Sequence, residues 1–146
     1  MKHIKLAFSF LISLVLIPIG NWINTAMLSE MPPVLLINFA CLVMWGNIAF
    51  FVKDKTVSTK TTLICMHIIP AVMIVITAYL EKVAKSFMVQ PWGHIVQVFY
   101  APLMWLKLPS FSVSITFIFF SSFLTLLLAA FVGCKAKESV IILKDN

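Results

Sequence analysis

Five stretches of this chain carry no charged side chain, and each is at least 20 residues long: 6–29, 31–52, 61–80, 86–106 and 108–134. The charged residues are confined to the gaps between these stretches and to the two ends. The hydrocarbon core of a bilayer is roughly 30 Å thick, and about 20 apolar residues in a helix cross it. The pattern therefore predicts an all-α integral membrane protein.

The composition agrees with this fold class. The chain has 146 residues, of which 62% are hydrophobic and 11% charged, with a mean hydropathy of +1.06. Soluble domains are about a quarter charged, so we expect one membrane domain, 1–146, joined by short loops. The net charge of +6 comes from lysines alone, since the chain has no arginine. Because these lysines lie at predicted helix ends, facing lipid headgroups, no nucleic-acid partner is expected.

The lysine distribution favours four spans over five. With four spans and both termini in the cytoplasm, eight lysines are cytoplasmic and three are external, whereas a fifth span changes the division to six and five. We therefore predict a four-helix up-down transmembrane bundle with a short cytoplasmic tail over 135–146. The predicted helices lie near 5–28, 33–52, 61–80 and 110–133.

The stretch 86–106 differs from the other four, because glutamines, a histidine and prolines interrupt it. It also holds aromatic residues of the kind that settle at the headgroup level. We predict an external interfacial or re-entrant segment between the third and fourth helices, with a true fifth span as the alternative. Its polar and indole side chains form either an interfacial polar face or an external docking surface: Gln90, Trp92, His94, Gln97 and Trp105.

Polar residues inside the predicted spans form two layers. In the outer layer, Asn21, Asn24 and Thr25 share a helix face at i, i+3, i+4 spacing, and Asn38 enters the next helix from the same side. Such amides either join neighbouring helices by hydrogen bonds or line a ligand or ion site. In the inner layer, Asn47 and His67 lie at similar depth on adjacent helices. We predict a hydrogen bond between them.

His67 is interpreted in two ways. It is either a satisfied core histidine or a proton-relay or metal residue. Haem ligation pairs two histidines at matched depth, and no second histidine meets this condition. We therefore expect no cofactor and no metal.

Small residues recur at i+4 spacing in the last predicted helix: Ser121, Thr125, Ala129 and Gly133. Small side chains let two helix backbones approach closely. This helix-packing seam fits contacts within the bundle as well as it fits a homo-oligomer or a partner helix.

The predicted spans contain no carboxylate, which argues against a proton-coupled antiporter. The chain has no H-E-x-x-H, no G-x-S-x-G and no glycine-rich phosphate loop, so we predict that it is not an enzyme. The expected function is that of a non-enzymatic interaction protein in a bacterial inner (plasma) membrane: a complex subunit, a modulator or a toxin-immunity protein. The alternative is a small oligomeric transporter or channel that uses the asparagine layer.

Overall fold

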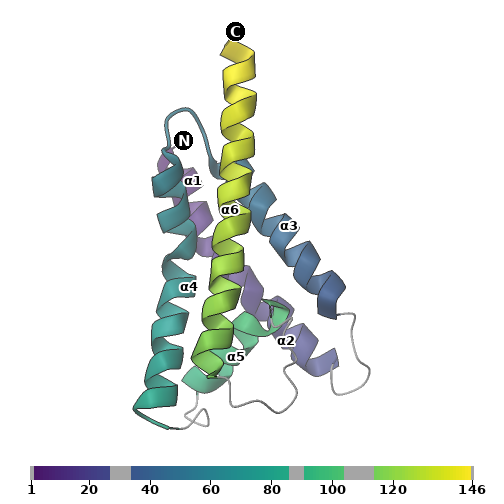
Figure 1. Cartoon of the computed structure of the whole chain (residues 1–146), viewed down its shortest axis with the longest axis vertical. Helices are drawn as coiled ribbons and strands as arrows, with labels where there is room; N and C mark the ends of the chain where they lie inside the picture. The colour runs from purple at the N-terminus through teal and green to yellow at the C-terminus, as the bar shows by residue number, and fades with distance from the viewer. Residues whose placement is uncertain (1, 27–33, 86–90, 104–113, 146) are drawn as a thin grey trace.

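The computed structural model describes residues 2–26, 34–85, 91–103 and 114–145, and within these ranges all regular secondary structure is helical. Figure 1 shows both termini toward the same end of the molecule and the short α5 toward the other end. The elements are α1 (Lys2–Ile12), η1 (Ser13–Val15), α2 (Leu16–Ala26), α3 (Val34–Val52), α4 (Thr59–Lys82), α5 (Trp92–Tyr100), η2 (Ala101–Leu103) and α6 (Ile115–Asp145).

Two of these helices are long and apolar enough to cross a membrane. They are α4, with 24 residues, and α6, with 31 residues. The apolar parts of the other long segments, Phe10–Ile23 and Leu36–Val52, are shorter. The predicted all-α class is thus confirmed among the described residues, together with two helices that can span a bilayer.

Two carboxylates join α4 to α6, one at each end of the pair. Glu138 accepts a hydrogen bond from the Thr59 hydroxyl and lies 3.7 Å from the Lys53 ammonium nitrogen. At the opposite end, Glu81 accepts hydrogen bonds from the Ser114 hydroxyl (2.8 Å) and from the backbone N–H of Thr116 (2.9 Å). We call these the Glu138 end and the Glu81 end of the molecule.

The predicted first helix, 5–28, is interrupted in the structure. The α-helical path breaks at η1 and resumes as α2, in a different direction from α1 (Figure 1). Pro18 explains the break, because a proline has no N–H to donate to the carbonyl of Leu14 and its ring crowds that turn.

A second proline explains how η1 is held. Pro70 lies inside α4 and cannot donate to the carbonyl of Met66 one turn earlier. The Ser13 hydroxyl donates to that carbonyl oxygen instead, at 3.1 Å, and the contact is buried. The hydroxyl in the break of one helix thus satisfies the backbone group that a proline leaves free in another.

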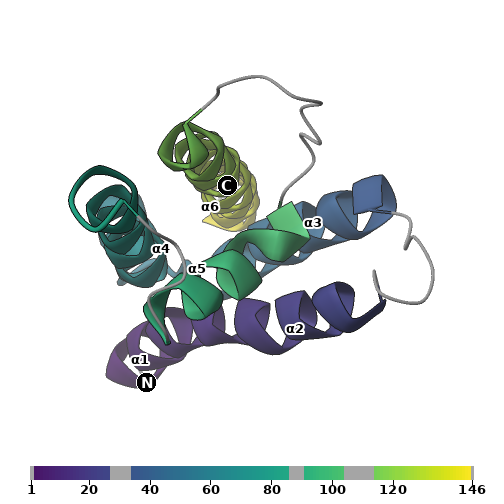
Figure 2. The ribbon, with the colours of Figure 1, turned by 90° about the horizontal axis from the view of Figure 1, so that it is seen from below.

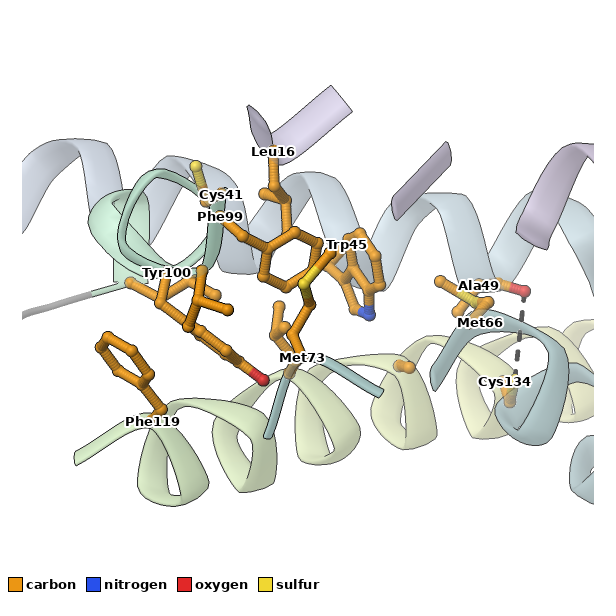
Figure 3. Packing of buried hydrophobic residues seen from close by; sticks show 14 residues of the cluster. Leu16, Cys41, Trp45, Ala49, Met66, Met73, Phe99, Tyr100, Phe119 and Cys134 are labelled. Atoms are coloured by element: carbon orange, nitrogen blue, oxygen red, sulfur yellow. Dashed lines mark hydrogen bonds between the residues drawn. The ribbon is translucent and has the colours of Figure 1, made fainter. Parts of the chain in front are cut away.

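Aromatic side chains fill the space where the helices meet (Figure 3). Trp45, Phe99, Tyr100 and Phe119 are each at most 1% exposed. The ring of Tyr100 stacks on that of Phe119, with centroids 4.6 Å apart, and its hydroxyl donates to the Pro70 carbonyl oxygen at 2.8 Å. This bond satisfies the buried phenol and fixes α5 against α4.

The segment predicted to be interfacial or re-entrant contains the nine-residue helix α5, followed by η2. Figure 2 shows α5 alongside α2, with α4 and α6 on its other side. The contact with α2 is close, because a Cβ atom on Gly20 would lie 1.7 Å from the Val98 carbonyl oxygen. The described nine-residue helix rises about 13 Å, less than half of the roughly 30 Å of a hydrocarbon core.

The last helix continues well past its predicted end near 133, through most of the predicted tail 135–146. The sequence of this part contains no glycine after Gly133 and no proline, and Lys135 donates to Glu138 at 2.8 Å, three residues on. The bonds from Glu138 to Thr59 and Lys53 fix this continuation against the α3–α4 connection. Tertiary contacts therefore extend the helix beyond its apolar stretch.

Candidate functional site

The predicted outer layer of asparagines is divided between the surface and the interior. Asn21 is exposed, and its backbone carbonyl accepts a hydrogen bond from the Thr25 hydroxyl at 2.5 Å. Asn38 is only 5% exposed, and neither its Oδ1 nor its Nδ2 has a hydrogen-bond partner among the described residues. The side chain of Asn24 lies outside the described part of the chain. The structure thus forms no hydrogen bond between these helices through Asn38.

The predicted hydrogen bond between Asn47 and His67 is not formed. Asn47 is exposed, and its Nδ2 donates to the Val43 carbonyl oxygen of its own helix at 2.8 Å. The Nδ1 of His67 lies 2.8 Å from the Leu63 carbonyl oxygen, also one turn earlier in the same helix. Asn47 is exposed whereas His67 is buried, and one nitrogen of each side chain bonds to the backbone of its own helix.

His67 belongs to a buried aromatic cluster. Its ring lies edge-on to Trp45, with centroids 6.1 Å apart, and edge-on to Phe123, at 5.6 Å. Since a carbonyl only accepts, the Nδ1 facing Leu63 carries the proton, and in the neutral ring Nε2 presents a lone pair. That Nε2 and the Trp45 Nε1 have no partner among the described residues. This geometry favours a packed core histidine over a metal ligand.

No group of three or more histidine, cysteine, aspartate or glutamate side chains that could hold a metal ion occurs in the described ranges. The three cysteines are free thiols, with Cys41 and Cys134 buried.

The small-residue seam of α6 packs largely against its own chain. The hydroxyls of Ser121 and Thr125 donate to carbonyls three residues earlier in α6, at 2.7 and 2.8 Å. Farther along, a Cβ atom on Gly133 would lie 2.0 Å from the Gly46 carbonyl oxygen, and one on Gly46 would lie 3.1 Å from that of Ala129. The Gly133 end of the seam therefore forms the tight crossing between α3 and α6.

Beside this crossing lies an open, apolar groove that the sequence patterns did not predict. It has a volume of about 490 Å³ and runs along α3 from Leu42 to Phe50 and along α6 from Thr125 to Ala136. We call it the α3–α6 groove. The sequence signal that indicates it is the presence of Gly46 in one helix and Gly133 in the other, because the missing side chains leave a depression where two helices cross.

The external docking candidates lie on α5 or next to it. Trp92 is 52% exposed and borders a pocket formed with Val75 and Tyr79 of α4, while His94 and Gln97 are exposed. Val96 and Phe99, which follow Trp92 at i+4 and i+7 on the same helix face, are fully buried, whereas His94 and Gln97 lie on the opposite face. The remaining two candidates, Gln90 and Trp105, lie outside the described residues. The helix thus presents His94 and Gln97 on the face opposite the core, and Trp92 at its start beside the pocket with α4.

Comparisons with protein-family models, with curated proteins and with solved structures give no match in any of the three.

Proposed function

We propose that this chain is a multi-pass protein of a bacterial inner (plasma) membrane that acts as a non-enzymatic interaction protein. It serves as a subunit or modulator of a larger membrane complex, or as an immunity protein that binds a toxin within the membrane. The observation that carries the proposal is the exposed edge of α5: His94 and Gln97 on one face, with the exposed Trp92 indole at the start of the helix, which is held by buried Val96, Phe99 and Tyr100.

Four spans with cytoplasmic termini are part of the proposal. In support, the chain runs from the Glu138 end toward the Glu81 end through α1 and α2, and α3 returns toward the Glu138 end (Figure 1). Among described residues, the connection 53–60 and the α6 extension place six lysines and three carboxylates near the Glu138 end. The Glu81 end carries Lys82 and Lys85. Under the positive-inside rule this asymmetry makes the Glu138 end cytoplasmic and α5 external.

An exposed indole on a helix that also presents hydrogen-bonding side chains suits a protein partner. Indole rings give large contact areas with little loss of conformational freedom, and they are enriched among the residues that dominate binding energy. Two interactions hold α5 in place: the hydrogen bond from the Tyr100 hydroxyl, and the close contact between Gly20 and Val98. They keep this edge preorganised. Because α5 is already ordered, little of the binding free energy of a partner is spent on ordering it.

The test is co-purification of a tagged chain at native expression in mild detergent, with mass spectrometry of the bound proteins. The variant Trp92→Ala/His94→Ala is compared with Trp22→Ala, which removes an indole that is 59% exposed on α2. We expect a stoichiometric partner with the wild type and with Trp22→Ala, and its loss from the double variant. A lone monomer or homo-oligomer from the wild type would refute a constitutive subunit. Equal binding by both variants would refute the α5 surface.

A small oligomeric transporter or channel is the second candidate, and Asn38 is the observation that favours it. A buried amide without partners is unfavourable in an apolar core unless a solute or another polar group meets it. Solute or ion flux into liposomes containing the wild type, abolished by Asn38→Leu and kept by Asn21→Leu, would support this function. Equal flux in wild type and Asn38→Leu would exclude a path through that amide.

A further inference from the structure

The α3–α6 groove has the length of one membrane leaflet. Along α6 it extends over twelve residues, from Thr125 to Ala136, and the eleven steps between them correspond to roughly 16 Å at 1.5 Å per residue. Half of a hydrocarbon core of roughly 30 Å is about 15 Å. A transmembrane helix of a partner needs a surface about twice as long. The groove therefore fits a ligand that enters from one leaflet and stops near the middle of the bilayer.

The walls of this groove are apolar and open to the surroundings. Val43 is 46% exposed, Leu128 is 63% exposed and Val132 is 58% exposed. Its floor lies at the crossing of Gly46 with Ala129 and Gly133, where the two helix backbones approach so closely that a Cβ atom on Gly133 would overlap the Gly46 carbonyl. Surfaces of this kind accept a hydrocarbon chain, because they offer dispersion contacts and demand no hydrogen bonds.

A cation lies at the Glu138 end of the groove. The ammonium nitrogen of Lys137 is 4.7 Å from the centroid of the Phe50 ring, and Phe50 is a wall of the groove. Lys53, in contrast, is buried and donates to the Val57 carbonyl oxygen at 2.9 Å, and Lys135 pairs with Glu138. The ammonium group of Lys137 therefore lies at the Glu138 end of the groove, which we call its mouth. The residues around this mouth carry a net positive charge.

An amide lies one turn deeper along the same wall. Asn47 precedes Phe50 by three residues, about 4.5 Å along α3, and it is exposed in the groove. Its Nδ2 bonds the Val43 carbonyl, so the amide is oriented by its own helix. From the mouth inward the groove thus offers a cation, then an amide, then an apolar channel.

We infer that the α3–α6 groove binds an anionic phospholipid of the leaflet at the Glu138 end. The phosphate pairs with Lys137, an ester carbonyl accepts from the Asn47 amide, and one acyl chain lies along the channel toward Thr125. This order matches the order of groups in a phospholipid from the headgroup inward. Basic positions between membrane helices on the cytoplasmic side are suited to anionic headgroups. The inference rests on the membrane placement proposed above and not on the α5 partner.

The test uses the full-length protein in nanodiscs made from equal amounts of dioleoylphosphatidylglycerol and dioleoylphosphatidylcholine, whose acyl chains are identical. Native mass spectrometry after release counts the lipids retained. We expect one tightly held phosphatidylglycerol in preference to phosphatidylcholine. Lys137→Gln should lower its retention about five-fold, since a lysine near an anionic membrane surface contributes about 1 kcal/mol. Asn47→Leu should lower the retention of both lipids.

Lys60→Gln is the matched control, because it removes one exposed lysine at the same end of the molecule but on α4. It should retain phosphatidylglycerol as the wild type does, and so should Trp92→Ala/His94→Ala. Equal retention of the two lipids by the wild type would overturn the inference. An equal loss in Lys60→Gln and Lys137→Gln would also overturn it, since general surface charge would then explain the preference. A protein helix that co-purifies and occupies the groove at Asn47 and Val43 in place of lipid would also refute the inference.

Discussion

The crossing of α3 and α6 makes a sharp prediction for a single added methyl group. Gly133→Ala would place a Cβ atom 2.0 Å from the Gly46 carbonyl oxygen, whereas ordinary contacts begin near 3.4 Å. The obstructing atom belongs to the backbone, so no side-chain rotation relieves the overlap and the helices must separate. Overpacking costs about 1–3 kcal/mol, and alanine recovers about 1 kcal/mol of helix propensity. Because the overlap is severe, we place the net loss near the upper end, at about 2 kcal/mol.

Gly46→Ala is the matched variant at the same crossing. Its Cβ atom would lie 3.1 Å from the Ala129 carbonyl oxygen, an overlap that a shift of a few tenths of an ångström removes. The gain in helix propensity then offsets most of the strain, and stability should stay within about 0.5 kcal/mol of the wild type. The assay is reversible unfolding in detergent by increasing SDS, followed by tryptophan fluorescence. Equal midpoints for the two variants, or a wild-type midpoint for Gly133→Ala, would refute the proposed backbone contact.

Three further variants test single hydrogen bonds. Ser13→Ala leaves the Met66 carbonyl without its side-chain donor and should reduce the free energy of unfolding by about 1 kcal/mol in the same assay. Tyr100→Phe removes the donor to the Pro70 carbonyl and should cost about 1 kcal/mol, while Tyr79→Phe, at an exposed position, should cost nothing measurable. Glu81→Ala removes the acceptor at the start of α6, so the Thr116 amide should exchange its hydrogen faster while amides near Leu126 are unchanged.

Charge spacing in the sequence predicts the long elements well. The run 61–80 and the observed α4, Thr59–Lys82, agree within two residues at each end, and 33–52 agrees similarly with Val34–Val52. These helices follow from apolar length alone, which is a local property of the chain. The end of α6 does not follow from apolar length, because its last turns depend on Glu138 meeting Lys53 and Thr59 from another part of the chain.

The polar positions show why a candidate site was harder to predict. Depth along a helix is readable from residue number, and it placed Asn47 and His67 at similar levels. Rotation about the helix axis decides whether two side chains meet, and it depends on how α3 crosses its neighbours. Gly46 and Gly133 set that crossing, with the result that Trp45 faces His67 while Asn47 faces the groove. The glycines, and not the polar residues, therefore determined which groups came together.

The two carboxylates give an independent measure of the apolar layer. From Thr59 to Glu81 in α4 and from Thr116 to Glu138 in α6 the separation is 22 residues in each helix, or roughly 33 Å. The polar bonds at both ends of this antiparallel pair thus enclose a length close to the roughly 30 Å of a hydrocarbon core. The charged residues inside it, Lys60, Lys135 and Lys137, all lie within three residues of the Glu138 end, so 61–80 of α4 and 117–134 of α6 carry no charge. The agreement favours the membrane placement on which both the α5 partner and the lipid groove depend.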